Sequence, residues 1–467
     1  MDFPVDSLRE PLCSSLGRGV RNFAVSAPTG SGKSTRLPAM LAEKIGGKIL
    51  VLQPRRVAAR MLAKFVARAA GSKAGEFAGW HIRLDKNYSE TTKIVFLTEG
   101  VLARMALSDP GLKGVGAIVF DEFHERNIFG DISLALALNS QKKHRPDLVL
   151  AVASASMDSG SVLGLLGDGA ESLECGSRMF PVDIRYAPAP PSAGKIWDAA
   201  ALEFSRLARE GSDGNFLIFM PGAYEISKTI SALKKIPAAS DFDIYPLHGS
   251  IPADLQDRAV QESARRKIVV ATNIAETSLT IGGVKYVIDS GLAKVSRYDP
   301  SRGVNTLLTE RISLASALQR AGRAGRTSAG VAVRLWKKSD EADFKRHLTP
   351  EILRLELSQT LLWLKCAGLD FCGLPLLDKP SAETAAGAER LLRELGALDS
   401  SGRPTKLGRV LGEFPSEPRF AKMLLESVNH NCLESVSLIA GVVEAGPVKA
   451  AGADARAEGE LQNMLDS

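Results

Sequence analysis

The stretch Ala27-Pro28-Thr29-Gly30-Ser31-Gly32-Lys33-Ser34-Thr35 decides the fold of this chain, because it joins a glycine-rich turn to a lysine and two hydroxyls. The apolar residues 22–26 before it predict a buried strand, and a helix is expected to begin near Lys33. Glycines let backbone N–H groups approach an anion closely, and the new helix adds its positive N-terminal end. The order strand, turn, helix therefore predicts a phosphate-binding loop of the nucleoside triphosphatase type.

Residues within this loop have different expected roles. Lys33 should reach the β and γ phosphates, and the Ser34 hydroxyl should ligate Mg²⁺. The first position of the usual G-x-x-x-x-G-K-[ST] pattern is Ala27 here, whereas its second glycine, lysine and serine are present. An ordinary glycine turn is the alternative, and the strand–turn–helix context weighs against it. The predicted nucleotide-binding residues are Thr29, Gly30, Ser31, Gly32, Lys33, Ser34 and Thr35.

A second apolar strand, expected over residues 117–121, ends in two carboxylates. Asp121 and Glu122 should lie above the carboxyl edge of the sheet, where parallel sheets bind their ligands. Asp121 is expected to hold Mg²⁺ directly or through water, and Glu122 to orient and activate the attacking water. A solvated turn is the alternative for such a pair, and the phosphate loop makes it the weaker one. The predicted metal-binding residues are Ser34, Asp121 and Glu122.

The composition is typical of a globular protein. The chain has 467 residues, of which 45% are hydrophobic and 24% charged, and its five cysteines are scattered without a C-x-x-C pair. The N-terminus has no basic start followed by an apolar stretch, so no signal peptide is indicated and the cytoplasm is the default location. A net charge of +6 permits a polyanionic partner but does not require one.

Apolar strand-like runs alternate with helical stretches in two successive sets. The first set covers 22–26, 48–52, 93–97, 117–121 and 148–153, and the second covers 215–219, 242–246, 267–271, 285–289 and 330–335. Apolar strands separated by helices predict parallel sheets covered on both faces. The proline-rich residues 187–192 between the sets are predicted to be a linker. The fold class is therefore α/β, with two tandem domains of which only the first carries a phosphate loop.

The strand pattern ends after about residue 340. Helical spacing of apolar residues is found over 351–367, 383–396 and 418–426, which predicts a small helical domain. The tail from Lys449 to Ser467 is rich in alanine, glycine and charge and is expected to be mobile.

Many short blocks, in a fixed order over residues 22–440, resemble the superfamily 2 helicases of the DEAH/RHA-box group. Asp121-Glu122-Phe123-His124-Glu125-Arg126 is similar to the signature box of that family, with Phe where Ala is usual, a variant that resembles the bacterial HrpB-like branch. The resemblance implies two RecA-like domains of the P-loop NTPase fold and an ATP-dependent RNA helicase that uses ATP and Mg²⁺. It also implies a monomer that binds single-stranded RNA and does not associate with a membrane.

Further blocks resemble the nucleic-acid contacts of the family. Gln53–Arg60 and Thr98-Glu99-Gly100 look like its first two RNA-contacting blocks, and each follows a predicted strand, so their side chains can face a phosphate chain. The run 272–280 is close to the fifth motif, whose hydroxyls touch RNA phosphates and sense ATP. Solvated loops are the alternative for each block taken alone. The implied nucleic-acid-binding residues are Arg55, Arg56, Thr98, Thr272 and Asn273.

Residues 319–326 resemble the sixth motif of the family. By this resemblance Gln319 contacts the γ-phosphate or the attacking water, while Arg323 and Arg326 reach the triphosphate. An arginine supplied across a cleft can be worth roughly 10³–10⁵ in rate. Arginines on a helix face are the alternative, against which Gly322 and Gly325 weigh. The implied catalytic set is Lys33, Asp121, Glu122, His124, Gln319, Arg323 and Arg326.

The remaining blocks complete the implied domain order. Ser154-Ala155-Ser156 resembles the block that couples the nucleotide state to the second domain, and 289–314 resembles a hairpin insertion with its turn at 300–303. The implied domains are an ATP-binding RecA-like domain over 1–186, a second RecA-like domain over 187–340, a winged-helix domain over 341–427, and a partial ratchet segment with the tail over 428–467.

The last segment is shorter than the helical ratchet domain of the family, so the chain is either a shortened protein or a fragment. ATP hydrolysis is therefore a firmer expectation than processive unwinding. Two alternatives stay open: an RNA-stimulated ATPase that clamps or remodels RNA–protein complexes, and a nucleic-acid-binding scaffold without turnover.

Overall fold

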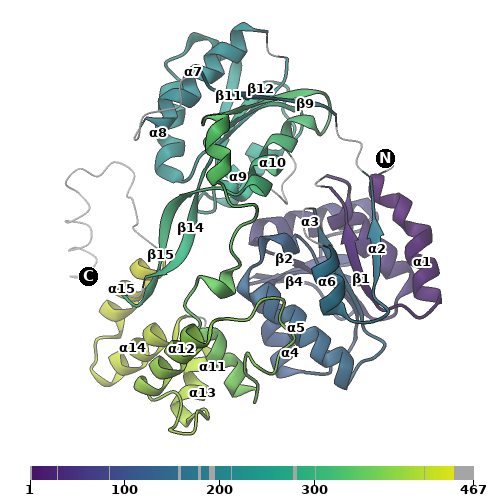
Figure 1. Cartoon of the computed structure of the whole chain (residues 1–467), viewed down its shortest axis with the longest axis vertical. Helices are drawn as coiled ribbons and strands as arrows, with labels where there is room; N and C mark the ends of the chain where they lie inside the picture. Colours follow the sequence, from purple (N-terminus) through teal and green to yellow (C-terminus); the bar gives the residue numbers. More distant parts are fainter. Residues whose placement is uncertain are drawn as a thin grey trace. The chain divides into compact units, whose positions relative to one another are not determined.

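The computed structural model describes residues 3–28, 30–83, 85–155, 159–176, 180–188, 195–211, 213–276, 281–299, 301–414 and 416–445. The chain forms two compact units. The first comprises Met1–Leu355 with Leu374–Lys379, and the second comprises Glu356–Gly373 with the residues from Pro380 onward. Both large sheets and their helices belong to the first unit (Figure 1).

The first sheet has eight strands within the described residues, in the order β4-β3-β5-β2-β6-β7-β1-β8, and all neighbours are parallel except β3 and β4. The strands are β1 (Asn22–Ser26), β2 (Lys48–Gln53), β3 (Ala78–Ile82), β4 (Asp85–Asn87), β5 (Ile94–Thr98), β6 (Val115–Phe120), β7 (Val149–Ser154) and β8 (Glu171–Glu174). Every residue of β6 and β7 is buried, as expected for central parallel strands with helices on both faces.

Helices cover this sheet. They are η1 (Pro4–Leu8), α1 (Arg9–Gly17), α2 (Lys33–Lys44), α3 (Arg56–Ala69), α4 (Glu99–Ser108), η2 (Phe123–Glu125), α5 (Ile128–Lys143) and α6 (Ser159–Leu166). Apolar residues of α1, α2 and α3 form one core cluster with the strands, represented by Leu12, Leu37 and Ala63. The loops that end β1, β2, β5 and β6 therefore lie along one carboxyl edge of the sheet.

Among the described residues, the second sheet has six parallel strands in the order β11-β12-β10-β13-β16-β9. The strands are β9 (Val182–Tyr186), β10 (Asn215–Phe219), β11 (Phe242–Leu247), β12 (Arg266–Ala271), β13 (Val284–Asp289) and β16 (Gly330–Arg334). Its helices are α7 (Ile196–Arg209), α8 (Ala223–Leu233), η3 (Pro237–Asp241), α9 (Ala253–Val260), η4 (Asn273–Ala275), α10 (Leu314–Ala321), η5 (Gly322–Gly325) and η6 (Lys338–Asp343). Residues of α7 and α8 pack on one face, and residues of α9 and α10 on the other.

An antiparallel hairpin, β14 (Leu292–Asp299) with β15 (Val304–Arg311), follows β13, as the sequence resemblance implied. Pro300 of its turn lies outside the described residues. All ten predicted strands are present, with ends that differ by at most two residues. Strands β3, β4, β8 and β9 were not predicted. They are short and lie at or near the sheet edges, where β4, β8 and β9 expose many residues and so have a weak apolar pattern.

Strand β9 corrects a predicted domain boundary. The sequence placed residues 182–186 at the end of the first domain, but β9 pairs with β16 in the second sheet. The second sheet domain therefore begins before residue 187. Of the predicted linker 187–192, residues 189–192 lie outside the described residues.

The segment 351–367 is a second correction. Continuous helical spacing was predicted, but Glu351–Leu353 forms a separate 3₁₀ turn (η7) and helix α11 begins only at Ser358. The backbone N–H and the carboxylate of Glu351 bond to residues 126 and 128 of the first sheet domain, which takes this turn out of the helix. Residues 341–355, predicted to open the winged-helix domain, accordingly belong to the first unit.

The second unit is helical in its described part. Its helices are α11 (Ser358–Cys366), α12 (Ala382–Glu394), α13 (Lys406–Glu413), α14 (Pro418–Asn429) and α15 (Leu433–Ala445). One antiparallel bridge joins Leu398 to Pro404 between α12 and α13. The predicted mobile tail 449–467 lies outside the described residues. No described helix has both the length and the apolar character that spanning a membrane requires.

Candidate nucleotide-binding site

The glycine turn after β1 has the backbone that a phosphate cradle needs. Gly30 and Gly32 adopt φ values of +86° and +91°, a region that side-chain-bearing residues rarely enter, and α2 begins directly at Lys33. The Ser31 hydroxyl is buried in this turn, and its oxygen has no hydrogen-bond partner among the described residues. Thr35 donates a hydrogen bond to the carbonyl of Gly32. Thr29, the other predicted loop residue, lies outside the described residues.

Lys33 meets the carboxylates that follow β6. Its Nζ lies 3.1 Å from Oε2 of Glu122, and both side chains are almost fully buried. Asp121 lies beside this pair, accepting a hydrogen bond of 2.6 Å from Gln53 and another from the Ser34 hydroxyl. The predicted metal-binding side chains Ser34, Asp121 and Glu122 thus lie together with Lys33.

The two carboxylates have opposite pKa shifts. Burial alone would raise the pKa of Glu122, but the charge of Lys33, assisted by His124 and the Lys33 hydrogen bond, lowers it to about 2. Burial and repulsion from Glu122 raise the pKa of Asp121, against the opposing effect of Lys33 and of its hydrogen bonds to Ser34 and Gln53. Glu122 is therefore held as an anion, and Asp121 is a group whose charge needs a further cation.

Residues of the second sheet domain face this point. The amide nitrogen of Gln319 lies 2.9 Å from Nε2 of His124, whose Nδ1 lies 3.5 Å from Glu122. A Cβ built onto Gly30 would lie 3.5 Å from Nε of Arg326, so this arginine lies directly against the glycine turn. The structure therefore joins Glu122, His124 and Gln319 in one chain of contacts that runs from the first sheet domain to the second.

Arg323, which is buried, and Arg326, which is half-buried, form a crowded pair of cations. Burial and repulsion from Arg326 lower the pKa of Arg323, although the charge of Glu122 opposes this effect. Burial lowers the pKa of Arg326 to about 10. Nε of Arg323 donates to the carbonyl of Glu276 at 3.0 Å, which fixes its direction. Two desolvated guanidinium groups beside a lysine favour a ligand with several negative charges.

The backbone explains why this motif is not a surface helix. Helix α10 ends at Ala321, and Gly322–Gly325 continues as the buried 3₁₀ turn η5. A Cβ on Gly325 would come within 2.6 Å of the carbonyl oxygen of Phe180, so only glycine fits there. Arg320, which the sequence did not single out, is fully buried and pairs with Glu276 at 3.1 Å and Asp289 at 2.8 Å. Arg320 thus holds the turn that carries Arg323.

The predicted nucleic-acid residues are only partly gathered. A cavity of about 700 Å³ is lined by Arg55, Arg56, Thr272 and Asn273, and Arg55 donates to the carbonyl of Asn273 across the two sheet domains. Thr98 precedes α4 and does not line this cavity. Arg60, which belongs to the predicted block Gln53–Arg60, also lines it, and so does Arg83, which was missed because it follows β3, a strand that was not predicted. Residues 277–280 of the fifth motif and Ser156 of the coupling block lie outside the described residues.

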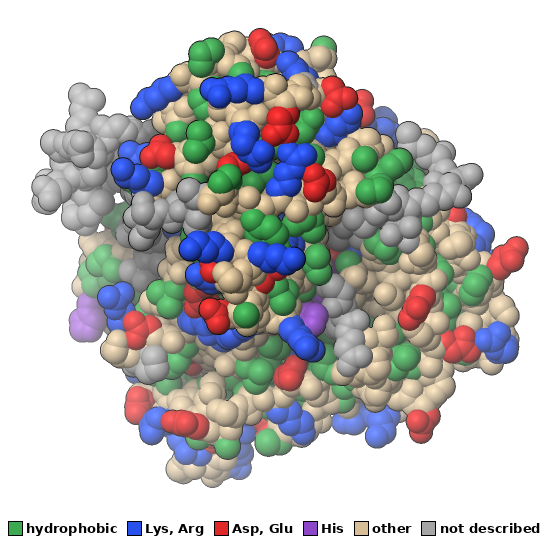
Figure 2. Space-filling view, turned by 45° about the horizontal axis from the view of Figure 1, so that its top comes forward, with side chains coloured by type: hydrophobic (Ala, Val, Ile, Leu, Met, Phe, Trp, Pro, Cys, Tyr) green, Lys and Arg blue, Asp and Glu red, His purple; other side chains and the backbone are tan. Residues whose placement is uncertain are grey.

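Positive and negative side chains are mixed both on the visible face of the molecule and in the lining of this cavity. Figure 2 shows Lys and Arg side chains mixed with Asp and Glu over the visible face, without a uniform basic band. Asp85 and Glu125 themselves line the cavity with the arginines. Its case as a nucleic-acid site therefore rests on the placement of its arginines at the carboxyl ends of the strands.

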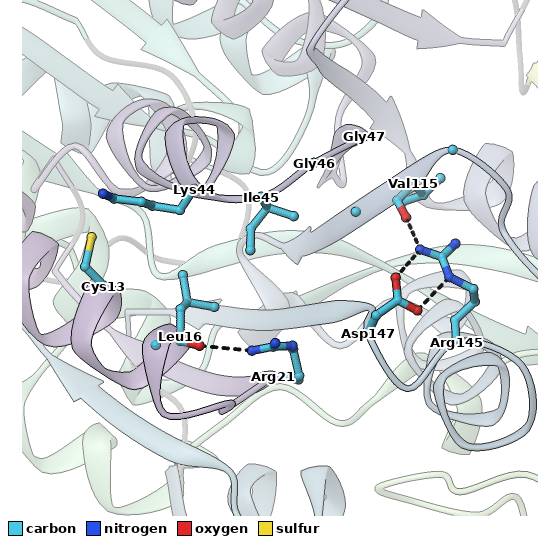
Figure 3. Close-up of a pocket in the computed structure, with 13 residues that line it drawn as sticks. Cys13, Leu16, Arg21, Lys44, Ile45, Gly46, Gly47, Val115, Arg145 and Asp147 are labelled. Atoms are coloured by element: carbon cyan, nitrogen blue, oxygen red, sulfur yellow. Dashed lines mark hydrogen bonds and ion pairs between the residues drawn. The ribbon is translucent and has the colours of Figure 1, made fainter.

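A second cavity, of about 670 Å³, lies at the opposite end of the first sheet (Figure 3). It is lined by residues that precede β1, β2, β6 and β7, among them Arg21, Gly47 and Gly114. Arg145 does not offer a free cation there, because it pairs with Asp147 and donates to the carbonyl of Val115. This cavity contains none of the predicted site residues, and we do not assign it to the nucleotide.

Glu99, directly after β5, leads to a prediction on stability. Burial and the nearby charges of Glu351 and Glu125 raise its pKa from 4.5 to about 8. Above pH 4.5 the unfolded chain releases this proton and the folded chain keeps it, so stability falls as the pH rises towards 8. The wild-type chain should lose stability between pH 6 and pH 8, and in Glu99→Gln this loss should be smaller by about 1–2 kcal/mol. Thermal unfolding of both proteins at the two pH values measures this; an equal loss in both would contradict it.

Three family models match the chain in order. The DEAD/DEAH box helicase model matches residues 12–161, and the helicase conserved C-terminal domain model matches residues 200–328. The winged-helix model of the helicase associated domain (HA2) matches residues 388–415. The first two models cover the two sheet domains, and the third falls within the second unit.

Known proteins agree with these matches. The chain is 38% identical over 428 residues to the ATP-dependent RNA helicase HrpB of Escherichia coli K12, covering 91% of this chain and 52% of HrpB. It is 35% identical over 455 residues to HrpA of the same organism, covering 94% of this chain and 34% of HrpA. The chain thus spans about half of HrpB and about a third of HrpA.

A solved structure is similar throughout. The crystal structure of the E. coli DEAH/RHA helicase HrpB superposes with a TM-score of 0.88 at 35% identity, covering all of this chain and 61% of the crystallised one. The fold is therefore that of two tandem parallel-sheet domains followed by a winged-helix region. The phosphate loop and the acidic box fall within the first model and residues 319–326 fall within the second, so the chain contains a DEAD/DEAH box helicase domain followed by a helicase conserved C-terminal domain.

Proposed function

We propose that this chain is an ATP-dependent RNA helicase of the DEAH/RHA type, which couples ATP hydrolysis to movement along single-stranded RNA. The observation that carries the proposal is the contact between the two sheet domains. Arg326 lies against Gly30 of the phosphate loop, while Gln319 meets His124 of the acidic box. A triphosphate at this position has cations on both sides, which favours charge development during phosphoryl transfer.

Lys33 is the residue that links binding to chemistry. In the structure its ammonium group pairs with Glu122, which keeps the pKa of that carboxylate low and makes it a weak base. A γ-phosphate competes for Lys33, and once the pair separates, burial raises the basicity of Glu122. Glu122 then accepts the proton of the attacking water. Arg323 and Arg326 stabilise the charge on the transferring phosphoryl group, and Gln319 with His124 positions the water.

The oxygen groups beside Lys33 fit Mg²⁺. Asp121 and the Ser34 hydroxyl lie together, and no described cluster of three or more acidic, histidine or cysteine side chains offers an alternative metal site. Mg²⁺ bound with nucleotide usually takes one or two protein oxygens and keeps phosphates and waters as its other ligands. Here it would neutralise phosphate charge, and its own charge would meet the requirement of Asp121 for a cation.

We further propose that one chain is a sufficient catalytic unit, because both halves of the site come from the same chain. The cytoplasm is the proposed location. The five cysteines carry no disulfide in the described residues, which is usual in reducing compartments.

The RNA part of the proposal is tested by ATPase rates against single-stranded RNA, single-stranded DNA and duplexes, with strand displacement followed in parallel. Arg56 lines the cavity between the sheet domains with an exposed side chain. Arg56→Ala should raise the RNA concentration needed for half-maximal ATPase several-fold and flatten the salt dependence of log K by about 0.7. Arg18→Ala, an exposed arginine beside Glu171 far from the cavity, is the control. Equal RNA responses of both variants would contradict this nucleic-acid site.

A further inference from the structure

The turn η7 (Glu351–Leu353) bonds directly to the end of the acidic box. The backbone N–H of Glu351 donates to the carbonyl of Arg126 at 3.0 Å. The carboxylate of Glu351 accepts from the N–H of Ile128 at 3.1 Å. One residue thus holds the two ends of the short segment that leaves the acidic box and enters α5.

The same turn bonds to the hairpin of the second sheet domain. Arg354 pairs with the second carboxylate oxygen of Glu351 at 3.3 Å, and its guanidinium also donates to the carbonyl of Ser296 in β14. The carbonyl of Arg354 in turn accepts from the N–H of Tyr298 at 2.9 Å. Arg354 is nearly buried, with a side chain 6% exposed. Glu351 and Arg354 therefore form a continuous hydrogen-bonded link from the acidic box to β14.

The acidic box connects to this link through a tightly turned backbone. Glu122 and Arg126 both have left-handed backbone angles, with φ of +51° and +49°, and the tight turn η2 between them contains His124. Such conformations cost free energy in residues other than glycine and are maintained by their surroundings. Arg126 is anchored by Asp131 at 3.0 Å and Asp378 at 2.7 Å. Three residues of tightly turned backbone thus separate Glu122 from Arg126, whose carbonyl Glu351 holds.

We propose that Glu351 and Arg354 are positioning residues that connect the nucleotide site to the β14–β15 hairpin. Through them, binding of a γ-phosphate at Lys33 changes the order of the hairpin. The inference rests on the proposed function for its purpose, because a hairpin that responds to nucleotide is useful only to a motor. Neither residue touches the nucleotide, so replacing them leaves basal ATPase within a few-fold and acts on coupling.

The experiment measures hydrogen exchange of the β14 and β15 amides, with and without a saturating non-hydrolysable ATP analogue. In the wild-type chain the exchange rates of these amides should change with the analogue, and Glu351→Ala should remove this response. RNA stimulation of the ATPase should fall in the same variant by roughly 5–150-fold, the usual range of allosteric coupling. Glu351→Gln keeps an oxygen for Ile128 and should restore part of both responses.

Asp299→Ala is the matched control. Asp299 pairs with Arg302 and accepts a hydrogen bond from Ser301 in the turn of the same hairpin, so its replacement loosens the hairpin without breaking the link through Glu351 and Arg354. Thermal unfolding shows whether each variant is folded. If Glu351→Ala is not folded, Arg354→Lys replaces it in the hydrogen-exchange experiment. A hairpin response that persists in the Glu351 and Arg354 variants, or is absent from a wild-type chain shown to bind the analogue, overturns the inference. A wild-type chain that binds the analogue but lacks RNA-stimulated ATPase instead overturns the proposed function.

Discussion

Replacing Lys33 with alanine should lower the rate of ATP hydrolysis by on the order of 10³ at saturating ATP, because a buried cation aimed at developing phosphate charge is lost. The structure adds a consequence for Glu122 that is separate from the loss of rate. Without Lys33, Glu122 loses the partner that keeps it ionised, and burial raises its pKa. Phosphate release measured over a range of ATP concentrations gives the size of the loss.

The control for this variant lies on the same helix. Lys44 is an exposed residue in the last turn of α2, and Lys44→Ala should hydrolyse ATP like the wild-type chain. Breaking a buried ion pair can cost about 3–5 kcal/mol, so thermal unfolding must show that Lys33→Ala is folded. Glu122→Gln, which keeps a hydrogen-bonding oxygen near Lys33, should bind ATP and fail to hydrolyse it. A folded Lys33→Ala that hydrolyses ATP at the normal rate would exclude the phosphate loop as the catalytic site.

Replacing Arg323 with alanine should also lower hydrolysis by roughly 10³, the lower end of the range known for arginines supplied across a cleft. Arg323→Lys should restore little, because lysine lacks the planar fork that pairs with two phosphoryl oxygens. Stability should change differently. Burial and Arg326 lower the pKa of Arg323, so its cation is costly to keep in the folded chain. In the absence of nucleotide, Arg323→Ala should therefore melt no lower than the wild-type chain.

Arg320 provides the contrast within the same motif. Arg320 is buried like Arg323, but it has two carboxylate partners, Glu276 and Asp289. Arg320→Ala should destabilise the chain by about 3–5 kcal/mol, because it leaves both carboxylates without their cation. Thermal unfolding separates the two arginines, and phosphate release by Arg323→Ala tests catalysis. If Arg323→Ala were as unstable as Arg320→Ala, Arg323 would be a structural residue and its assignment to catalysis would be wrong.

The fold was predictable where a short stretch of sequence by itself determines the local backbone conformation. A phosphate-binding turn before a helix requires residues with positive φ, and Gly30 and Gly32 have them. Most of the ten predicted strands have apolar centres that are buried, and all ten are present. Strand β9 was assigned to the wrong domain, because a short, half-exposed edge strand gives no sign of which sheet it joins. The spacing of apolar residues over 351–357 predicted a helix that is not present, because polar groups of this segment bond to distant parts of the chain.

The site was predictable in its motifs but not in its supports. Lys33 and Glu122 were expected to act together, and the structure pairs them. The pairing of Arg320 with Asp289 joins residues that no local spacing rule relates, and Arg83 enters its cavity from a strand that has no recognisable motif. Tertiary contacts of this kind depend on how strands are ordered in the sheet, which a single sequence does not specify.

The central claim is that the two sheet domains share one ATP hydrolysis site. Phosphate release from ATP tests it most directly, measured with and without single-stranded RNA for the wild-type chain, Lys33→Ala and Arg323→Ala. We expect release that RNA stimulates in the wild-type chain and that is almost lost in either variant, since one residue comes from each sheet domain. Release by the wild-type chain that persists when either residue is replaced would contradict a hydrolysis site shared between the two sheets.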